Sequence, residues 1–219
     1  ILMQKILVTG GSGFIGANLI LRLTEEGYKV VCFDFKKPKL KNFSPSAVTY
    51  CRGNIFDKKK IEKAMSDCQV VIHLAASLGV QNTEENILNC LNVNILGTKK
   101  VLEAACKKKN RKFIFASSSE IYGEQSTFPI KEDANPKIKS VYGLSKITAE
   151  KYVIGFNQKF NLNYNIIRFF NIYGYGQEKN FVIPKFAENI KKSKTIQIYG
   201  NGDQLRCFCN IDDAVNGVI

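Results

Sequence analysis

The stretch that decides the fold follows the first apolar run of the chain and reads Val8-Thr9-Gly10-Gly11-Ser12-Gly13-Phe14-Ile15-Gly16. Its spacing Gly10-x-x-Gly13-x-x-Gly16 lies between a predicted strand, Lys5–Thr9, and a predicted helix over residues 13–26. The first glycine permits a tight turn, the second lets the backbone approach a pyrophosphate, and the third lets helix and strand pack closely. The start of the helix also offers unpaired N–H groups to phosphates. The stretch therefore predicts a dinucleotide-binding turn, although a glycine-rich turn without a ligand has the same local pattern.

An acidic residue follows about 20 positions after the glycines, as a dinucleotide-binding unit requires. It is Asp34, which directly follows a second predicted strand at residues 29–33. A carboxylate there accepts hydrogen bonds from the adenosine ribose and repels a 2′-phosphate, so we expect NAD rather than NADP. Lys36 and Lys37 lie just beyond and would attract that phosphate. We give more weight to Asp34, because the tip of a strand has a defined position.

Short apolar runs alternate with helical periodicity along most of the chain. Further strands are expected at residues 48–51, 69–74, 112–116 and 164–168, and further helices at 58–66, 86–109 and 141–160. Nearly continuous apolar strands separated by helices indicate parallel strands that are buried on both faces. The predicted fold class is therefore α/β, a doubly wound parallel (Rossmann) sheet.

The character of the sequence changes after about Ile172, where glycines separate shorter elements. We expect a Rossmann domain that binds NAD at residues 1–171 and the start of a small substrate-binding region at 172–219. The last residues, from Asp212 onward, have the pattern of a helix that is beginning. The C-terminal region is therefore predicted to be incomplete, and the chain truncated.

Composition excludes several classes of protein. With 45% hydrophobic and 23% charged residues, the chain has the composition of a globular protein, and no apolar run approaches the roughly 20 residues of a membrane helix. The N-terminus lacks the features of a signal peptide, so we expect no membrane partner and a cytoplasmic location. The seven cysteines form no Cys-x-x-Cys pair and there is one histidine, which predicts reduced thiols and no metal site.

The formal charge of +13 leaves two interpretations open. Lysines gather in four segments, at residues 36–41, 58–60, 107–112 and 191–194. They could form a surface that binds nucleic acid. Each segment, however, falls at the boundary of a predicted element, where solvated lysines are common, so we do not expect nucleic acid as a partner.

Two further segments carry chemistry. Tyr142 and Lys146 are four residues apart and share one face of the predicted helix at 141–160. A nearby ammonium group stabilises a phenolate, so we expect Lys146 to lower the pKa of Tyr142 from about 10 toward a value useful for a general base. Such a pair also occurs on solvated helix surfaces. Upstream, hydroxyl side chains at residues 117–119 follow a predicted strand, where ligands bind in sheets of this kind.

In combination these motifs resemble the extended short-chain dehydrogenase/reductase family, in particular its nucleotide-sugar epimerases, dehydratases and decarboxylases. The resemblance runs from Ile6 to the final residues. It also rests on His73-Leu74-Ala75-Ala76, on Asn94 within residues 92–98, on Arg168-Phe169-Phe170-Asn171, and on residues 200–206 followed by Asp212-Asp213.

The resemblance implies a site for NAD. The pyrophosphate would be held by Gly10, Gly13, Phe14, Ile15 and Gly16, and the adenosine ribose by Asp34. Adenine would be flanked by Asn54, where many relatives have Asp, and Ile55. The remaining path of the cofactor would be lined by Leu74, Ala75, Ala76, Asn94, Phe169, Tyr142 and Lys146. His73 is expected to pack at its strand end rather than to act as a catalyst.

The resemblance also implies the reaction. Tyr142 as phenolate would take the proton of a sugar 4-hydroxyl while the hydride passes to NAD, and the product of this step is a 4-keto sugar. Ser118 would help to activate the sugar, and Lys146 would bond the nicotinamide ribose. Asn171 would contact the nucleotide sugar, and Arg206 would contact its phosphates. The implied partners are a nucleotide sugar and a second copy of the chain, because relatives commonly dimerise through the helices predicted at 86–109 and 141–160.

Glu120, also a catalytic candidate, leaves the type of reaction open. Ser119 stands where dTDP-glucose dehydratases have an acidic Asp, which argues against that type, but Ser-Glu occurs in decarboxylases, GDP-mannose-type dehydratases and many epimerases. Glu120 could equally be an outward-facing loop residue. We favour a UDP-sugar 4-epimerase, with a UDP-glucuronate decarboxylase or an NDP-sugar 4,6-dehydratase as alternatives. A non-catalytic NAD- or RNA-binding relative would not need Ser118, Tyr142 and Lys146. We expect this chain to bind NAD but to convert sugar nucleotides poorly.

Overall fold

The computed structural model describes residues 4–38, 46–78, 80–198 and 200–219, so Lys39 and Lys41 of the first lysine segment lie outside the described residues. The chain divides into two compact units, Ile1–Phe169 and Phe170–Ile219. This division lies two residues before the boundary that the sequence suggests. The assignment of one unit to the cofactor and of the other to the substrate stays a prediction.

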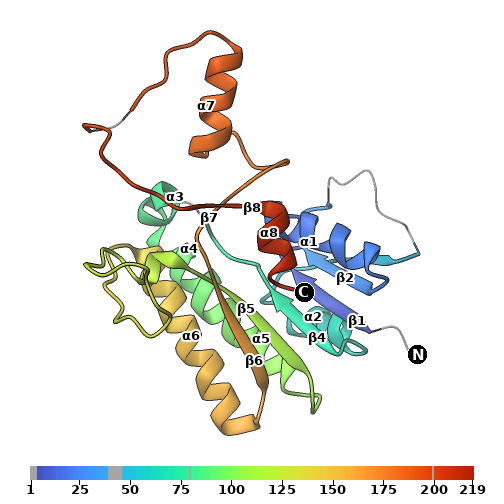
Figure 1. The fold of residues 1–219 in the computed structure, drawn as a ribbon. Coiled ribbons are helices and arrows are strands. Elements are labelled where there is room, and N and C mark those ends of the chain that lie inside the picture. The colour runs from blue at the N-terminus through green and yellow to red at the C-terminus, as the bar shows by residue number, and fades with distance from the viewer. Residues whose placement is uncertain (1–3, 39–45, 79, 199) are drawn as a thin grey trace. The chain divides into compact units, whose positions relative to one another are not determined.

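The first unit contains a six-stranded parallel sheet with the order β3-β2-β1-β4-β5-β6 (Figure 1). Its strands are β1 (Lys5–Thr9), β2 (Lys29–Asp34), β3 (Val48–Arg52), β4 (Val70–His73), β5 (Lys112–Ser118) and β6 (Asn163–Phe169). All six predicted strands are confirmed, with ends that differ by at most two residues. The strand order reverses direction between β1 and β4, and in such sheets a ligand binds at the carboxyl ends on either side of this reversal.

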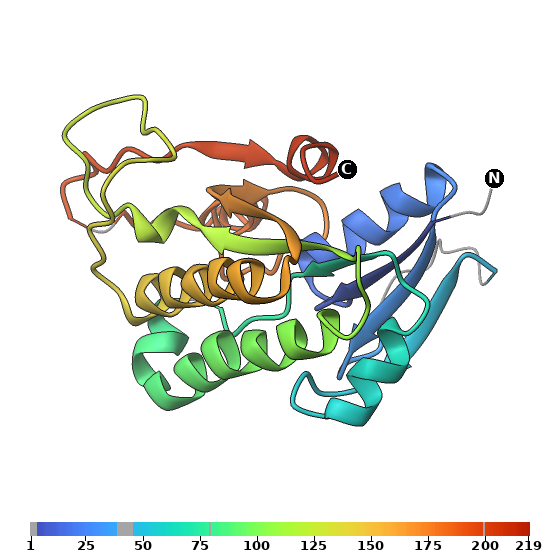
Figure 2. The same cartoon turned by 90° about the horizontal axis from the view of Figure 1, so that it is seen from below.

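Helices cover both faces of this sheet (Figure 2). They are α1 (Phe14–Glu25), α2 (Lys58–Met65), α3 (Val80–Glu85), α4 (Ile87–Leu91), the π-helix η1 (Asn92–Gly97), α5 (Thr98–Ala105) and α6 (Val141–Phe160), with a 3-10 turn η2 (Ser119–Ile121) after β5. Helix α1 lies on one face, and α2, α5 and α6 lie on the other. The fold class is therefore the predicted Rossmann-like α/β sheet.

One helix prediction is wrong. The apolar periodicity predicts a single helix over residues 86–109, but α4 passes into the π-helix η1, and α5 ends at Ala105. A π-helix adds a residue to the turn, which is common at functional sites and which periodicity does not reveal. The segment between α5 and β5 contains Asn110 in a left-handed conformation, with a φ of 60°.

The main core lies between the sheet and helices α2, α5 and α6. It includes the fully buried rings of Phe33, Phe113 and Phe115, from β2 and β5, packed with Ile61 of α2 and Leu102 of α5. Alternate residues of each strand face this core, because side chains of a strand point in turn to opposite faces.

Arg111 departs from the solvated character expected for residues 107–112. It is 3% exposed, and its guanidinium donates to the carbonyl oxygens of Met65, Cys68, Ala104 and Ala105. These carbonyls lie at or just beyond the ends of α2 and α5, where helices leave acceptors without partners and where a positive charge is favourable. One buried arginine therefore joins the ends of two helices that pack on the sheet.

The second unit is small. Strands β7 (Asn171–Tyr173) and β8 (Phe208–Asn210) pair in parallel, α7 (Val182–Lys191) lies between them in sequence, and α8 (Ile211–Asn216) follows β8. The helix expected from Asp212 begins one residue earlier, because the Asn210 side chain caps it by accepting from the N–H of Asp212 at 2.8 Å. Within the described residues, no helix has the length and apolar character that crossing a membrane requires.

Candidate active site

The glycine turn connects β1 to α1, and at Gly10 and Gly16 neighbouring backbone leaves no space for a side chain. Gly10 has a φ of 69°, in the left-handed region, and its N–H donates to the Phe33 carbonyl at 3.0 Å. Gly13 is the N-cap of α1 and makes no side-chain cap, so the N–H groups of the first helical turn face outward. A Cβ on Gly16 would lie 2.3 Å from the Gly10 carbonyl oxygen. The turn is therefore a narrow cradle of N–H donors that fits a pyrophosphate, which is the fit that a dinucleotide requires.

Asp34 ends β2 directly beside this turn. Its carboxylate accepts from the N–H of Ser12 at 3.0 Å and from the N–H of Lys36 at 2.9 Å, and the residue is 8% exposed. The structure therefore brings together the acidic residue and the glycines that the sequence pairs by spacing. The side chains of Lys36 and Lys37 are exposed.

The ends of β3 and β4 adjoin the same region. The N–H of Gly53 donates to the Asp34 carbonyl at 3.0 Å, and this places Asn54 and the buried Ile55 directly after β3. On the other side, a Cβ on Gly10 would lie 2.7 Å from the backbone nitrogen of Ala75. The predicted cofactor residues at positions 54–55 and 74–76 thus follow the carboxyl ends of strands that neighbour the turn.

His73 is buried at the end of β4, as expected. Its Nδ1 lies 2.6 Å from the hydroxyl of Thr9, and its Nε2 lies 3.0 Å from the hydroxyl of Thr98. Burial, followed by the charge of Lys146, lowers the pKa of His73 to about 3. The ring is therefore neutral near pH 7, and it joins β1 to the start of α5.

This burial predicts a dependence of stability on pH. The unfolded His73 takes up a proton below its usual pKa of about 6.5, whereas the folded one stays neutral until about pH 3. The contribution is therefore fully present above pH 6.5 and is lost as the pH falls, by about 2 kcal/mol at pH 5. We expect urea unfolding to show this loss in the wild-type chain but not in His73→Gln. An equal loss of free energy of unfolding in both proteins between pH 7 and 5 would contradict the assignment.

Tyr142 and Lys146 project from the first turns of α6. The helix begins at Val141 because the Ser140 hydroxyl caps it, accepting from the N–H of Gly143 at 3.0 Å. Lys146 is 3% exposed, its Nζ donates to the Ala116 carbonyl at 2.8 Å, and it lies 5.6 Å from the centre of the Tyr142 ring. The helix thus holds the phenol and the ammonium group side by side at the end of β5.

The expected lowering of the Tyr142 pKa is wrong for this arrangement. Burial is the largest effect and raises the pKa of Tyr142 well above its usual range, and the neighbouring Cys90 and Glu120 raise it further. A hydrogen bond with the Ser118 side chain opposes this shift. Burial also lowers the pKa of Lys146 to about 8. The i, i+4 spacing shows that the two groups are neighbours, but it contains no information on their desolvation.

Ser118 and Glu120 face this pair. Ser118 ends β5, and its Oγ accepts from the N–H of Glu120 at 3.2 Å. The Glu120 carboxylate is exposed and accepts from the Ser140 hydroxyl at 3.3 Å. Glu120 is therefore tied to the N-terminus of α6 and acts electrostatically on Tyr142, so it is not an isolated outward-facing residue.

Asn94 is turned inward by the π-helix. It is 1% exposed, its Oδ1 accepts from the N–H of Ser77 at 2.8 Å, and its Nδ2 donates to Ser145 Oγ at 2.9 Å. Ser145 in turn donates to the Tyr142 carbonyl at 2.7 Å. The amide thus joins the loop after β4 to the helix that carries Tyr142. Ser145 is not among the predicted site residues, although it lies inside the Tyr142–Lys146 motif.

The remaining candidates lie in different units. Phe169 ends β6 and pairs in register with Ser118. Asn171 and Arg206 belong to the second unit, where Asn171 Nδ2 donates to the Cys207 carbonyl at 2.9 Å and Arg206 is exposed. Their predicted contacts with a substrate stay predictions. Within the described residues, no group of three or more His, Cys, Asp or Glu side chains could hold a metal ion.

Comparison with known proteins agrees with the family resemblance that the motifs carry. Residues 6–219 match the family described as "NAD dependent epimerase/dehydratase family". A putative UDP-glucose 4-epimerase of Methanocaldococcus jannaschii is 36% identical over 213 residues, which cover 95% of this chain and 70% of the relative. A UDP-N-acetyl-alpha-D-glucosaminuronate decarboxylase of Bacillus cytotoxicus is 36% identical over 228 residues, covering 99% and 70%. The crystal structure of UDP-glucuronic acid 4-epimerase from Bacillus cereus, in complex with UDP-glucuronic acid and NAD, has a TM-score of 0.89 and 32% identity, covering 98% and 72%.

Proposed function

The chain belongs to the NAD dependent epimerase/dehydratase family, and on that premise we propose that it is a UDP-sugar 4-epimerase. Membership confirms the resemblance that the motifs show, and it confirms an NAD-dependent enzyme. The observation that carries the proposal is the cluster of Ser118, Tyr142 and Lys146 at the carboxyl end of β5. Two of the similar proteins are named as UDP-sugar 4-epimerases, which supports this choice of reaction and substrate.

The residues present fit the cofactor. The turn from Gly10 to Gly16, with Phe14 and Ile15 at the start of α1, would hold the pyrophosphate, and Asp34 would hold the adenosine ribose. Asn54 and Ile55 would flank adenine, and Leu74, Ala75, Ala76, Asn94 and Phe169 would line the rest of its path. When bound, NAD supplies a hydride acceptor and a positively charged ring.

Side chains of this chain would transfer the proton of the sugar 4-hydroxyl. Tyr142 would accept the proton of the sugar 4-hydroxyl as that carbon is oxidised, and would return it when the ketone is reduced on its opposite face. Ser118 would hold the same hydroxyl through the oxygen that now bonds to Tyr142. Because burial keeps the phenol protonated, an added positive charge near the ring is needed to make Tyr142 a base at neutral pH.

A decarboxylase is the second candidate. The chain is as similar to a glucosaminuronate decarboxylase as to a 4-epimerase, with 36% identity in both cases. Glu120 lies close enough to Tyr142 to raise its pKa, so a carboxylate is available beside the reacting sugar. A decarboxylase would form the same 4-keto sugar and would then release carbon dioxide.

The deciding experiment is incubation of the enzyme in its full length with UDP-, dTDP- and GDP-sugars, with products identified by mass and NMR. An unchanged mass with inversion at carbon 4 of a UDP-sugar is the expected result. Loss of carbon dioxide or of water would replace the proposal by a decarboxylase or a dehydratase. No product with any sugar nucleotide, together with strongly salt-dependent RNA binding, would favour a non-catalytic relative.

Cofactor choice is predicted from Asp34. A like charge beside the 2′-phosphate costs several kcal/mol, so we expect Kd for NADP to be at least about 100-fold higher than for NAD. Asp34→Asn should lose most of this preference, as measured by calorimetry. Asp67→Asn is the control, because Asp67 is exposed and pairs with Lys5 at the N-terminal end of β1. Equal wild-type affinities would mean that Lys36 and Lys37 outweigh Asp34.

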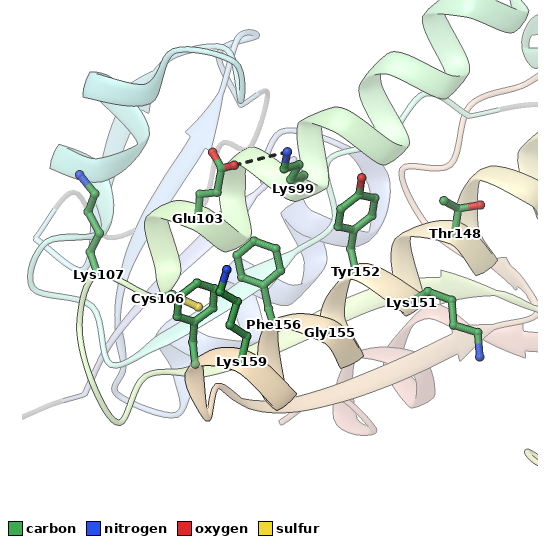
Figure 3. A pocket seen from close by; sticks show the side chains of 11 residues that line it. Lys99, Glu103, Cys106, Lys107, Thr148, Lys151, Tyr152, Gly155, Phe156 and Lys159 are labelled. Atoms are coloured by element: carbon green, nitrogen blue, oxygen red, sulfur yellow. Dashed lines mark ion pairs between the residues drawn. The ribbon is translucent and has the colours of Figure 1, made fainter.

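We also propose that the chain forms a homodimer in the cytoplasm. A groove of about 710 Å³ runs between the outer faces of α5 and α6, and it contains none of the catalytic candidates. Figure 3 shows Tyr152 and Phe156 of α6 projecting into it beside Glu103 and Lys99 of α5, which form an ion pair. Phe160 of α6 also lines the groove, and Leu144 of α6 and Leu96 of η1 expose further apolar surface. A second copy would cover this face with its own two helices. All seven cysteines are free, which supports a reducing compartment.

A charged side chain introduced into the groove between α5 and α6 tests the proposed dimer. Phe160 is 50% exposed, so Phe160→Glu should leave the fold intact and raise the dimer Kd at least about 100-fold, because a charge would be buried between the copies. Leu205→Glu is the control, since Leu205 is 90% exposed in the second unit. Sedimentation velocity measures both. A wild-type chain that is monomeric at micromolar concentration would refute the proposed interface.

A further inference from the structure

Arg168 belongs to a motif that supports the resemblance, but the proposed reaction gives it no part. It lies on β6, where it pairs in register with Ser117, and its side chain reaches α6. Nε donates to Glu150 Oε1 at 3.0 Å, and Nη2 donates to Glu150 Oε2 at 2.8 Å. The Glu150 side chain is 3% exposed, so this is a bidentate and largely buried ion pair.

The third nitrogen of the same guanidinium reaches the segment that follows β5. Nη1 lies 2.8 Å from the hydroxyl of Tyr122 and donates to the Glu132 carbonyl at 2.6 Å, while the guanidinium lies over the Tyr122 ring. Tyr122 directly follows the 3-10 turn that begins after Ser118. The position of Ser118 is therefore linked to α6 through Tyr122 and Arg168.

Glu150 provides the link to the ammonium group. It lies four residues after Lys146, so the two side chains share a face of α6. The groups that act on Lys146 come from several elements: Cys90 of α4, His73 of β4, and Tyr142 and Glu150 of α6. His73 is neutral, and burial raises the pKa of Cys90 and so disfavours its thiolate. Glu150 is therefore the acidic side chain of this set that can place a negative charge near Lys146.

We propose that Glu150 and Arg168 are positioning residues of the active site, with Tyr122 as their link to Ser118. Glu150 places a carboxylate one helical turn from Lys146, and the Arg168 guanidinium holds that carboxylate in a fixed position and joins α6 to the 3-10 turn that follows Ser118. This inference rests on the proposed function, because its kinetic effects need the 4-hydroxyl oxidation as the reaction.

A purely structural role is a weaker account of these contacts. A buried ion pair recovers little net stability after desolvation, and apolar residues of similar size often replace one without loss. Here Nε and Nη2 bind the carboxylate one turn from Lys146, while Nη1 binds the hydroxyl of Tyr122, directly after the 3-10 turn, as well as the Glu132 carbonyl. This arrangement suits the control of geometry and charge.

Two variants separate the effect of Glu150 on the charge of Lys146 from the effect of Tyr122 on the position of Ser118. Glu150→Gln removes the charge and keeps the size, so the ionisation midpoint of Lys146, about 8 in the wild type, should fall by about one pH unit, a tenfold loss of proton affinity. The alkaline limb of the kcat profile should move by the same amount. Tyr122→Phe removes only the hydroxyl, so kcat should fall about tenfold at every pH with the midpoint unchanged, because Ser118 is less well placed. In both variants KM and the Kd for NAD should stay within about threefold.

The matched control is Glu26→Gln, which breaks an exposed pair between Arg22 and Glu26 at the end of α1. It should change neither kcat nor the Lys146 midpoint. The midpoint is read directly by NMR of the full chain carrying 13C-labelled lysine, which needs no substrate. Thus, a wild-type enzyme inactive on every sugar nucleotide would refute the proposed function, while the lysine titration would still judge the role of Glu150.

The proposal is overturned if Glu150→Gln leaves the Lys146 midpoint in place or if Glu26→Gln shifts it equally. It is also overturned if the loss of kcat in Tyr122→Phe only follows the fraction of protein that is unfolded, as measured by circular dichroism. A shifted midpoint in Glu150→Gln alone, with a pH-independent loss of kcat in Tyr122→Phe, supports it.

Discussion

Replacing Tyr142 by phenylalanine is expected to lower kcat about 1000-fold while Kd for NAD stays within about threefold. The substitution removes the only atom of this side chain that can carry the proton of the sugar hydroxyl, and it keeps the ring, whose centre lies 5.6 Å from Lys146 Nζ. The effect should exceed that of Ser118→Ala, because Ser118 only holds the sugar hydroxyl, whereas Tyr142 accepts the proton of that hydroxyl.

Kinetics and calorimetry test this prediction on the same preparation. Tyr152→Phe is the matched control, since Tyr152 lies on the same helix but lines the outer groove. It should retain kcat within about twofold, because it removes no group near the reacting sugar. A Tyr142→Phe enzyme with kcat within about tenfold of wild type would show that another group accepts the proton, and the first to examine would be Glu120.

Replacing Gly16 by alanine is expected to raise the Kd for NAD at least about 100-fold, which corresponds to about 2.7 kcal/mol. The added Cβ would lie 2.3 Å from the Gly10 carbonyl oxygen and 2.8 Å from the Gly11 Cα. Both atoms are backbone, so the turn itself must move, and the N–H groups that face the pyrophosphate move with it.

Calorimetry with NAD measures the loss, and circular dichroism shows whether the sheet remains folded. Gly155→Ala is the control, because no heavy atom lies within 4 Å of the Cβ that would be added on the outer side of α6. It should bind NAD with the wild-type Kd. Unchanged affinity in Gly16→Ala would mean that the cofactor does not rest on this turn.

Much of the fold could be predicted because its signals are local. The buried strands read as continuous apolar runs, and all six were found within two residues of their ends. Helix α6 was predicted with its observed ends, and both ends have local causes: the Ser140 cap and Asn161, which has a left-handed φ of 52°. Short-range patterns fail where the backbone departs from the common helix, as in η1 at Asn92–Gly97.

The site was predicted in part. The glycines, Asp34, Ser118 and the Tyr142–Lys146 pair were identified by spacing and family resemblance, and the structure brings the glycines to Asp34 and Ser118 to Tyr142. The direction of the Tyr142 pKa shift was not predictable. It depends on how much water the folded chain excludes and on Cys90, which belongs to another helix.

The amino-acid sequence by itself thus determines the strands, the glycine turn and the helix face shared by Tyr142 and Lys146, because each depends on residues a few positions apart. The inward amide of Asn94, the neutral His73 and the Arg168–Glu150 pair arise only on folding. They join groups that are distant in sequence. Their charge states and hydrogen bonds depend on the exclusion of water, and a short segment excludes water only after the chain has packed around it.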